Sequence, residues 1–559
     1  RMISIPKKPH DAQWTDDQWN AIYSEGQDIL VAAAAGSGKT AVLVERIIQK
    51  IMRNKQDVNR LLVVTFTNAS AREMKARVNA AIQKESTKHP EDEHLKSQRI
   101  KIHQAQISTL HSFCLSLIKA HYDEIDIDPN FRTANEVEGI VLLEQAIDDV
   151  LESYYEKNEQ SFIDLVEHLS NDRSDDQLRT IVKSLYRFSI AHAKPFEWLD
   201  SLDEPYYNLN KDHLYFQMMD EMIKRKLNSA KNVLYQSIDC YQNLNAVDAH
   251  MTYLEGERVW IDEVIEGTKS LESISNDLKK KKIPMNSSKV KKENEGDEQL
   301  LELGKDYHKK YINELNDLNN NYLSRERDYL IQDMQSIAPR VEILAEVTKD
   351  IIRYFRKLKQ NKRIIDFSDY EHLALDILTN EDGEPSEIAL QYREHFEEIL
   401  VDEYQDTNRV QEAIINCIKT GDESNGNLFM VGDVKQSIYK FRQAEPELFI
   451  EKYKRFNSDG NETGKVIDLS KNFRSRREVL DNTNFIFSHM MDEKVGEIEY
   501  NDEAKLYYGA DYDEQETPLE MDILVEESFK ETDNNLIEAK HVVEKVQYIL
   551  ENKSVYDRK

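Results

Sequence analysis

The sequence has few cysteines, no long apolar run and no secretory leader. Cys114, Cys240 and Cys417 are far apart and have no CxxC spacing, which argues against a disulfide framework and against a zinc or iron–sulfur site. No stretch approaches the ~18 apolar residues of a membrane span. Residues 1–10 are basic, but the apolar segment of a signal peptide does not follow them. We therefore expect a cytoplasmic protein with buried thiols.

Basic residues are scarce relative to acidic ones. The chain has 74 Lys and Arg against 105 Asp and Glu, a formal net charge of −31 at pH 7. Long-range repulsion from this charge opposes nonspecific coating of nucleic acid, so a bound strand must meet a local basic track. With 559 residues the chain exceeds one ordinary domain, and we expect a few lobes.

Strand signals occur in two groups, separated by a long helical segment. They lie at residues 29–33, 61–65, 107–110, 397–406 and 427–437. The first three alternate with helical patterns, which is typical of a parallel sheet, and the last two read as the completion of that sheet. Between the groups, residues 136–362 are rich in Glu, Lys, Leu and Tyr at helical spacing. The sequence predicts an α/β domain interrupted by a helical insertion.

Residues 33–40 have the pattern A-x-x-x-x-G-K-T, a Walker A loop with Ala33 in place of the usual first glycine. Its two later glycines let backbone N–H groups face phosphate oxygens, Lys39 reaches the β- and γ-phosphates, and Thr40 can hold Mg²⁺. An ordinary glycine turn is the alternative, and the apolar strand before the loop argues against it. The predicted nucleotide-binding residues of this loop are Ala35, Gly36, Ser37, Gly38, Lys39 and Thr40.

Two further polar groups follow predicted strands. The apolar residues 399–401 end in Asp402 and Glu403, which suit a division of labour. Asp402 would hold Mg²⁺ through water, and Glu403 would orient and deprotonate the attacking water. A solvated surface pair is the alternative. After the next strand, Gln436 is placed to contact the γ-phosphate and report its hydrolysis.

An aromatic and cationic cluster comes directly after Gln436. Tyr439, Phe441 and Arg442 lie within four positions. This combination suits stacking on bases and binding charged oxygens. Core packing of the two rings is the alternative.

In their order along the chain these blocks resemble those of superfamily 1 DNA helicases of the UvrD/Rep/RecB type. "WTDDQWNAI" at 14–22 resembles the Q motif, which implies that Gln18 reads the adenine edge. "LSKNFRS" at 469–475 resembles motif IV, which implies that Phe473 packs on the adenine and that Arg474 acts as an arginine finger. The resemblance implies RecA-like motor domains that use ATP and Mg²⁺.

The same resemblance implies how DNA is bound. "VVTFTNASAREMKARV" at 63–78 and "ISTLHSFC" at 107–114 resemble DNA-contacting motifs. Aromatic rings would stack on bases, while hydroxyl, amide and imidazole groups and one arginine would meet phosphates. For His111 a structural role is the alternative, and for Lys279 to Lys282 a solvated loop is favoured over a duplex contact. The predicted DNA-binding residues are Phe66, Thr67, Asn68, Thr109, His111, Tyr439, Phe441 and Arg442.

"TLHSFC", "DFSDYE" and "ILVDEYQDTNRVQE" are most similar to the AddA (RexA) family of bacterial helicase–nuclease subunits. That resemblance implies 3′→5′ movement on single-stranded DNA, unwinding of broken duplex ends for recombinational repair, a nuclease activity, and a heterodimer with an AddB-like (RexB-like) subunit. A stand-alone UvrD/Rep-like repair helicase is one alternative. A non-catalytic docking module is another, which the intact site residues disfavour.

The resemblance also implies a domain plan. Residues 1–135 and 363–460 would form RecA-like domain 1A, 136–362 a helical insertion 1B, and 461–559 the beginning of a second RecA-like domain 2A. The sequence departs from its relatives at Ala41, where arginine is common, and at Ala69, where lysine is usual. Late motor blocks of the type H-x-x-K-G-L-E and V-A-x-T-R-A are missing. We therefore expect the N-terminal part of a longer protein, able to bind ATP and single-stranded DNA but weak in hydrolysis and unwinding.

Overall fold

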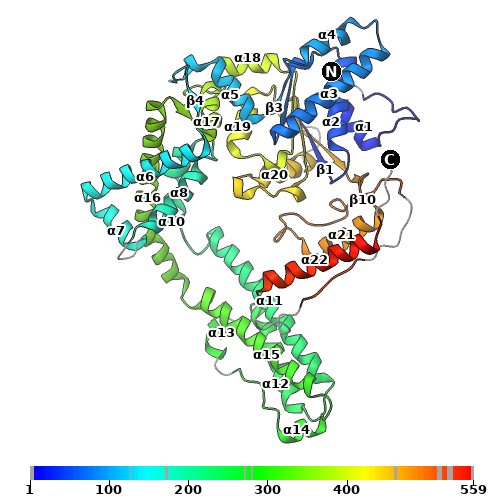
Figure 1. Cartoon of the computed structure of the whole chain (residues 1–559). Helices are drawn as coiled ribbons and strands as arrows, with labels where there is room; N and C mark the ends of the chain where they lie inside the picture. The colour runs from blue at the N-terminus through cyan, green and yellow to red at the C-terminus, as the bar shows by residue number, and fades with distance from the viewer. Residues whose placement is uncertain are drawn as a thin grey trace. The chain divides into compact units, whose positions relative to one another are not determined.

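The structure is a computed structural model that describes residues 5–125, 127–169, 174–269, 272–278, 281–458, 463–512, 519–524 and 533–554. The chain divides into two compact units (Figure 1). The first comprises Arg1–Ile125 and Tyr370–Lys559, and the second comprises Asp126–Asp369. In the part of the chain that is described, every helix is too short or too polar to span a bilayer.

A six-stranded parallel sheet forms the centre of the first unit, in the order β3-β2-β6-β7-β1-β8. The predicted α/β fold with a parallel sheet is confirmed. Strands from both ends of the long helical segment pair directly, since β2 lies beside β6 and β1 beside β7. The strands are β1 (Ile29–Ala33), β2 (Leu61–Thr65), β3 (Gln106–Thr109), β6 (Glu398–Asp402), β7 (Leu428–Gly432) and β8 (Lys465–Leu469).

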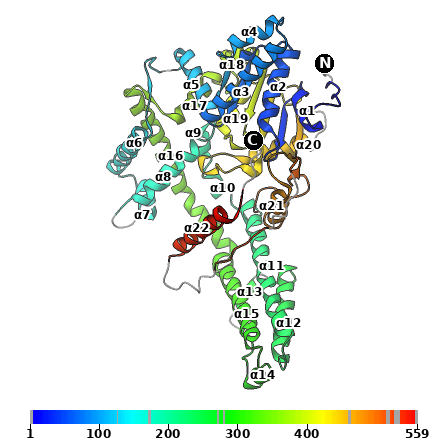
Figure 2. The same ribbon diagram turned by 45° about the vertical axis from the view of Figure 1, so that its right-hand side comes forward.

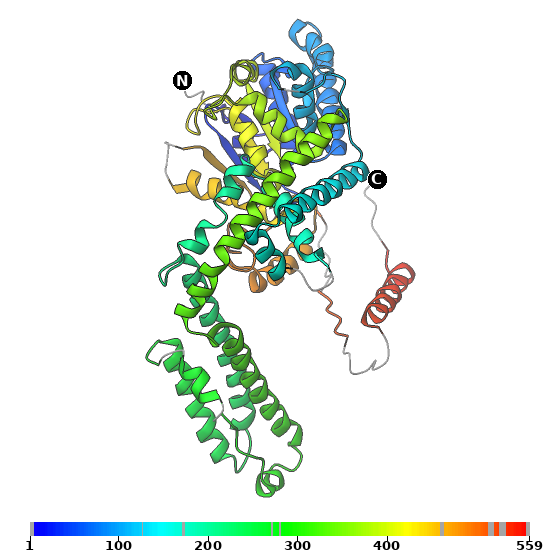
Figure 3. The same cartoon turned by 90° about the vertical axis from the view of Figure 1, so that its left-hand side faces the viewer.

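Both faces of this sheet are buried, which explains why its strands read as continuous apolar runs. Alternate residues such as Val31, Val63 and Val431 join one core cluster with helices α1 to α3. Their neighbours, such as Leu30 and Met430, point to the opposite face and are equally buried. Helices α19 and α20 lie on that second side (Figures 1 and 3). The polar residues that follow each strand therefore gather at one edge of the sheet.

The helices of the first unit surround this sheet. Two short strands, β9 (Lys471–Asn472) and β10 (Tyr507–Tyr508), pair separately. The helices are α1 (Asp16–Tyr23), α2 (Lys39–Arg53), α3 (Asn68–Lys88), α4 (Glu93–Lys101), α5 (Leu110–Ala120), α18 (Glu387–His395), α19 (Arg409–Ile418), α20 (Pro446–Ser458), α21 (Arg477–Met490) and α22 (Asn534–Asn552), and α17 (Phe367–Leu378) crosses the boundary between the units.

One strand lies in a different place from the one the domain plan gives it. The plan assigns residues 465–469 to a second motor domain, but as β8 they pair with β1 over five positions, from Ile29 with Lys465 to Ala33 with Leu469. The backbone N–H of Ala34 also donates to Leu469 O at 2.9 Å. These residues therefore belong to the first sheet. The rest of the domain plan stays a prediction.

The second unit is helical apart from the short parallel pair β4 (Arg132–Thr133) and β5 (Ile364–Ile365). It has two core clusters, one around α6 to α9 and the C-terminal half of α16, and one around α11 to α15 (Figure 2). The helices are α6 (Glu136–Lys157), α7 (Gln160–Leu169), α8 (Asp176–Ser189), α9 (Pro195–Asp200), α10 (Glu204–Tyr207), α11 (Leu214–Gln242), α12 (Asp248–Ile265), α13 (Glu272–Asp277), α14 (Ser288–Glu293), α15 (Glu298–Leu318) and α16 (Arg327–Asn361).

The lysine run of this unit corrects the expectation of a solvated loop. Lys281 is buried, its Nζ lies 2.5 Å from Glu257 Oε2, and it sits 3.4 Å from the centre of the Trp260 ring. Because its charge is paired inside the unit, Lys281 is unsuited to a duplex contact. Lys282 is exposed, and Lys279 and Lys280 lie outside the described residues.

A buried ion cluster ties the first sheet to its helices. Arg46 of α2 forms a bidentate pair with Glu398 at the start of β6, with Nε 3.1 Å from Oε2, and donates from Nη1 to Ala21 O at 2.7 Å. Lys50 Nζ lies 3.3 Å from Glu398 Oε1 and 3.0 Å from Glu25. Burial opposes ionisation of Glu398, but the two cations hold the pKa of this carboxyl below its ordinary value. The cluster therefore joins residues 352 positions apart.

Replacing Arg46 by Met should lower the free energy of unfolding of the first unit by about 3–5 kcal/mol, because it leaves the buried Glu398 charge with one cation only. Urea denaturation measures this loss. The double variant Arg46→Met, Glu398→Gln should recover roughly half of it, since the uncompensated charge is gone. A single variant as stable as the wild type would contradict the account.

The same cluster predicts a pH dependence of stability. The folded-state pKa of Glu398 is depressed, so its contribution is complete above the ordinary value of 4.5 and is lost as the pH falls through the folded-state pKa. The stability difference between the wild type and Glu398→Gln should therefore shrink below pH 4.5. A difference that stays constant down to lower pH would count against the depressed pKa.

Candidate functional site

The predicted phosphate loop runs from the end of β1 to the start of α2. Gly36 and Gly38 have φ of +70° and +87°, a left-handed backbone that favours glycine, and Gly38 caps α2. A Cβ on Gly36 would also lie 2.8 Å from Asn472 Nδ2 and 2.9 Å from Arg474 Cβ. Both glycines are therefore required by the turn, and Gly36 also by the close packing of residues 472–474 on it.

Lys39 at the start of α2 meets the acidic pair at the end of β6. Its Nζ lies 3.0 Å from Glu403 Oε2 and 3.3 Å from Oε1, a contact between residues 364 positions apart. Glu403 has φ of +53°, a left-handed conformation that costs a non-glycine residue about 1 kcal/mol or more. The sheet order explains the meeting, since β6 and β1 are each neighbours of β7. Lys39 and Glu403, predicted to share one site, are thus brought together.

The carboxylates of this site outnumber its cation. Burial, followed by the neighbouring charge of Glu403, raises the pKa of Asp402 to about 6. The same two causes raise the pKa of Asp406 to about 6, and its Oδ1 is buried without a hydrogen-bond partner among the described residues. Lys39 is the cation that opposes both shifts. The site therefore has a local excess of negative charge that a further cation would relieve.

This electrostatic excess fits the predicted Mg²⁺ site at Thr40 and Asp402. Among the residues with described positions, no group of three or more His, Cys, Asp or Glu side chains is arranged to hold a metal by itself. Mg²⁺ in phosphate-transfer sites takes one or two protein ligands and completes its shell with water and phosphate oxygens. The hydroxyl and carboxylate present are the hard oxygen donors that this ion prefers.

Gln18 lies against the phosphate loop and is almost fully buried. Its Nε2 donates to Ser37 O at 2.9 Å, and its Oε1 accepts from Thr15 N at 3.0 Å as part of the capping box of α1. Both ends of the amide are thus bonded, so contact with an adenine edge requires that one bond be exchanged. The adenine role stays a prediction.

Residues 472–474 anchor the other side of the loop. Asn472 Nδ2 donates to Ala35 O at 2.6 Å, and Phe473 N donates to Gly36 O at 2.9 Å. Asn472 Oδ1 accepts from Arg474 N at 2.9 Å. Phe473 and Arg474 therefore start beside the phosphate loop, as their predicted roles require. Asn472, which sequence reasoning missed, fixes both; its position inside the matched block was the available signal.

Gln436 follows β7 in a short 3₁₀ turn. Its Nε2 donates to Asp433 Oδ2 at 2.8 Å, and Asp433 also caps the turn by accepting from Lys435 N at 3.1 Å. Asp433 N in turn donates to Gln405 Oε1 at 3.0 Å. The predicted γ-phosphate contact of Gln436 is therefore prepared by two polar residues, Asp433 and Gln405, that sequence reasoning did not single out.

Four of the predicted DNA-binding residues form one cluster. The rings of Phe66 and Tyr439 stack with centroids 4.6 Å apart, and Phe441 lies 6.0 Å from Tyr439. The Arg442 guanidinium lies 5.2 Å from the Tyr439 centroid and 5.6 Å from that of Phe441. Phe441 is 74% exposed, which excludes core packing for this ring. The cluster offers an accessible aromatic face with a cation beside it.

The other predicted DNA-binding residues mark two helix starts. Thr67 caps α3 by accepting from Ser70 N at 3.0 Å, and Thr109 caps α5 by accepting from Ser112 N at 3.2 Å. Asn68 Oδ1 lies 3.5 Å from Ser112 Oγ, so these two helix starts adjoin. Exposed N–H groups at helix starts favour phosphate.

His111 on α5 lies 3.4 Å from Glu371 Oε1, which also accepts from Gln411 Nε2 at 2.6 Å. Its side chain is 42% exposed. The structure thus gives His111 an internal partner and an accessible surface together, so the choice between a structural and a DNA-binding role stays open.

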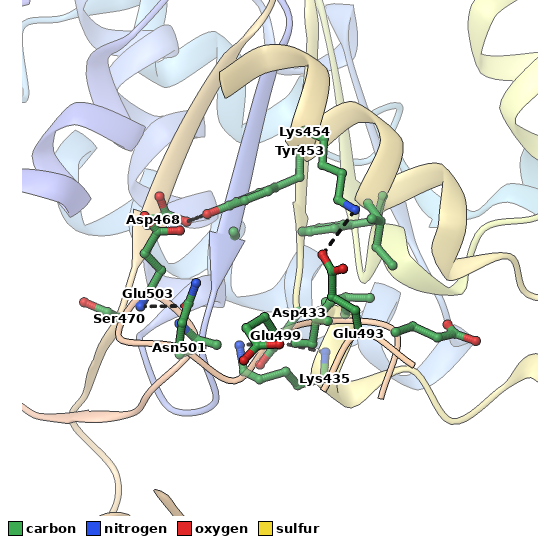
Figure 4. Close-up of a pocket in the computed structure, with 18 of the residues that line it drawn as sticks. Asp433, Lys435, Tyr453, Lys454, Asp468, Ser470, Glu493, Glu499, Asn501 and Glu503 are labelled. Atoms are coloured by element: carbon green, nitrogen blue, oxygen red, sulfur yellow. Dashed lines mark hydrogen bonds and ion pairs between the residues drawn. The ribbon is translucent and has the colours of Figure 1, made fainter. Parts of the chain in front are cut away.

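A cavity of about 200 Å³ lies at the carboxyl ends of β1, β7 and β8 (Figure 4). Its rim carries several carboxylates, of which Glu493 pairs with Lys454 at 3.7 Å and Asp468 accepts from Tyr453 Oη at 3.1 Å. An acidic rim is unsuited to phosphate. Among the described residues, none of the predicted site residues lines it. We assign it no part in triphosphate binding.

Comparison with known proteins gives two kinds of match. A family model described as the UvrD/REP helicase N-terminal domain matches residues 14–457. The chain is 57% identical over 558 residues to the AddA subunit of the ATP-dependent helicase/nuclease of Staphylococcus epidermidis (strain ATCC 12228 / FDA PCI 1200), and 56% identical over 560 residues to the same subunit in Staphylococcus aureus (strain JH9). These matches cover 99% and 100% of the chain and 46% of each relative. The chain thus spans about half the length of these relatives.

The Lys39–Glu403 contact predicts how one substitution alters triphosphate binding. Glu403→Gln should bind an ATP analogue about fivefold more tightly than the wild type, because the partly exposed pair no longer has to be broken to free Lys39. Equilibrium titration with a fluorescent analogue measures this. Lys39→Ala should lose binding. Equal affinity of Glu403→Gln and wild type would show that the pair does not compete with phosphate.

The aromatic cluster predicts a loss of single-stranded DNA binding. Phe441→Ala should weaken binding of an oligonucleotide about tenfold, since a base stack is worth about 1–3 kcal/mol. Fluorescence anisotropy measures the change. Phe485→Ala is the matched control, because Phe485 is 61% exposed but lies on α21 outside the cluster. The cluster is not the stacking surface if the two variants bind alike.

Proposed function

The chain belongs to the UvrD/Rep helicase family, and on that premise we propose that it is the motor portion of an ATP-dependent DNA helicase. The observation that carries the proposal is the Lys39–Glu403 contact at 3.0 Å. It joins a phosphate loop to the acidic end of a neighbouring strand, as hydrolysis of a nucleoside triphosphate requires. The stacked pair Phe66–Tyr439 on the same sheet supplies the surface for a single strand.

In the proposed reaction the phosphates of ATP are held by backbone N–H groups of residues 35–40, and the γ-phosphate takes the place of Glu403 at Lys39. The freed Glu403 carboxylate orients the attacking water and accepts its proton. Lys39 and Arg474 stabilise the charge that develops on the γ-phosphate, and Gln436 contacts the same group. Thr40 and Asp402 would hold Mg²⁺, which supplies charge neutralisation at the β- and γ-oxygens. Gln18 and Phe473 hold the adenine.

Movement along DNA follows from the position of the two sites on one sheet. Bases stack on the cluster of Phe66, Tyr439 and Phe441 without sequence preference, because every base has a π-face. Thr67, Asn68, Thr109, His111 and Arg442 meet phosphates. Nucleotide binding and release then alternate between two arrangements of the motor domains 1A and 2A, with 1B as the inserted domain. The proposed direction is 3′→5′.

The proposed biological setting is the processing of broken DNA ends. The similarity to the AddA subunits of two helicase/nucleases supports a role as one component of a helicase–nuclease that works in the cytoplasm with an AddB-like partner in recombinational repair. In this proposal the nuclease activity belongs to the part of the longer relatives that the chain does not span. The similarity also favours the helicase–nuclease component over a stand-alone repair helicase.

A lysine substitution in the intact helicase that contains this chain tests the proposal. Lys39→Ala should lower DNA-dependent ATP hydrolysis by about 10²–10³-fold, since it removes a donor to the transferring phosphoryl group. A phosphate-release assay with and without oligonucleotide measures it. Lys84→Ala, an exposed lysine on α3, is the control and should behave as the wild type. Unchanged hydrolysis in Lys39→Ala would overturn the enzyme and favour a docking module.

A further inference from the structure

Gln405 occupies a position between the acidic end of β6 and the loop that follows β7. It lies in the 3₁₀ turn Tyr404–Asp406 and is 1% exposed. Its Nε2 donates to Glu403 Oε2 at 2.9 Å, and its Oε1 accepts from Asp433 N at 3.0 Å. One side chain thus bonds both the proposed catalytic carboxylate and the turn that leads to the aromatic cluster.

The fold makes room for this amide. Gly432 is the last residue of β7, and a Cβ at that position would collide with Gln405 Oε1 and lie 3.3 Å from Gln405 N. Any larger residue at the end of β7 would therefore push the amide off Asp433. The place of Gln405 is built by the strand that it contacts.

The chemistry of the two neighbours requires an amide at position 405. Asp433 N is a donor and needs an acceptor, whereas an ionised Glu403 offers acceptors and needs a donor. An amide supplies one of each, and the order of its two ends is set by these partners. A carboxylate of the same shape keeps the bond to Asp433 but places a second negative charge beside Glu403.

The connection continues from Asp433 to the aromatic cluster. Asp433 accepts from Gln436 Nε2 at 2.8 Å and pairs with Lys435 Nζ at 3.0 Å, which fixes the short turn after β7. Three residues after this turn, Tyr439 stacks on Phe66. A shift of Tyr439 on a bound base therefore reaches Glu403 through two side chains, those of Asp433 and Gln405.

We infer that Gln405 is a positioning residue that couples occupancy of the aromatic cluster by single-stranded DNA to the orientation of Glu403. The inference rests on the proposed function. In the free protein Gln405 and Lys39 both bond the Glu403 carboxylate. Once a triphosphate occupies Lys39, Gln405 remains as the group that aims the carboxylate, and its aim depends on the loop that DNA contacts.

The test compares Gln405→Glu, Gln405→Ala and the wild type in the intact helicase. We expect ATP-analogue affinity and DNA affinity to change little, while stimulation of ATP hydrolysis by an oligonucleotide falls about tenfold or more through kcat, not KM. Gln49→Glu is the matched control, since Gln49 also donates to a carboxylate, Glu45 Oε1 at 2.8 Å, but lies on α2 away from this connection. Thermal unfolding of each variant reports any loss of folding.

The outcomes separate this inference from the proposed function. If the wild type shows no stimulation by DNA, the proposed function fails. If the wild type is stimulated and both Gln405 variants keep the same ratio of stimulated to basal hydrolysis, the inference alone is overturned. A parallel loss of nucleotide binding, basal rate and thermal stability in both variants would also overturn it, because that pattern marks a merely structural residue.

Discussion

The contact between Lys39 and Glu403 is the constraint on which the rest of the site depends. It requires that the loop after β1 and the end of β6 face the same edge of the sheet, although a helical segment of more than 200 residues separates the two halves of that sheet in sequence. Parallel pairing of β6 and β1 with β7 satisfies this requirement. Residues from both sides of the insertion can therefore act on one triphosphate.

Local charge matters more here than the charge of the whole chain. A formal charge of −31 disfavours phosphate and nucleic acid at long range, yet the site places a lysine and helix-start N–H groups where phosphate would sit. The raised pKa values of Asp402 and Asp406, each about 6, show that the carboxylates repel one another and lack enough cations. An acidic site of this kind is suited to a metal–triphosphate complex rather than to a free anion.

Much of the fold and site could be predicted because local patterns encode them. The bounds of β1 and β2 match the apolar runs 29–33 and 61–65, and the phosphate loop lies where its glycines place it. Other features depend on partners far away in sequence. The burial of Lys281 is decided by Glu257 and Trp260, and the place of β8 by β1. Gln405 and Asn472 bond to backbone groups, which leave no signature in the sequence.

The most direct measurement is a crystal structure of the protein with a non-hydrolysable ATP analogue and Mn²⁺ in place of Mg²⁺, with the metal located by its anomalous signal. The account predicts triphosphate density along residues 35–40, the metal between Thr40 and Asp402, and Lys39 moved from Glu403 to the γ-phosphate. A triphosphate bound elsewhere, or bound at the loop with the Lys39–Glu403 pair still intact, would contradict it.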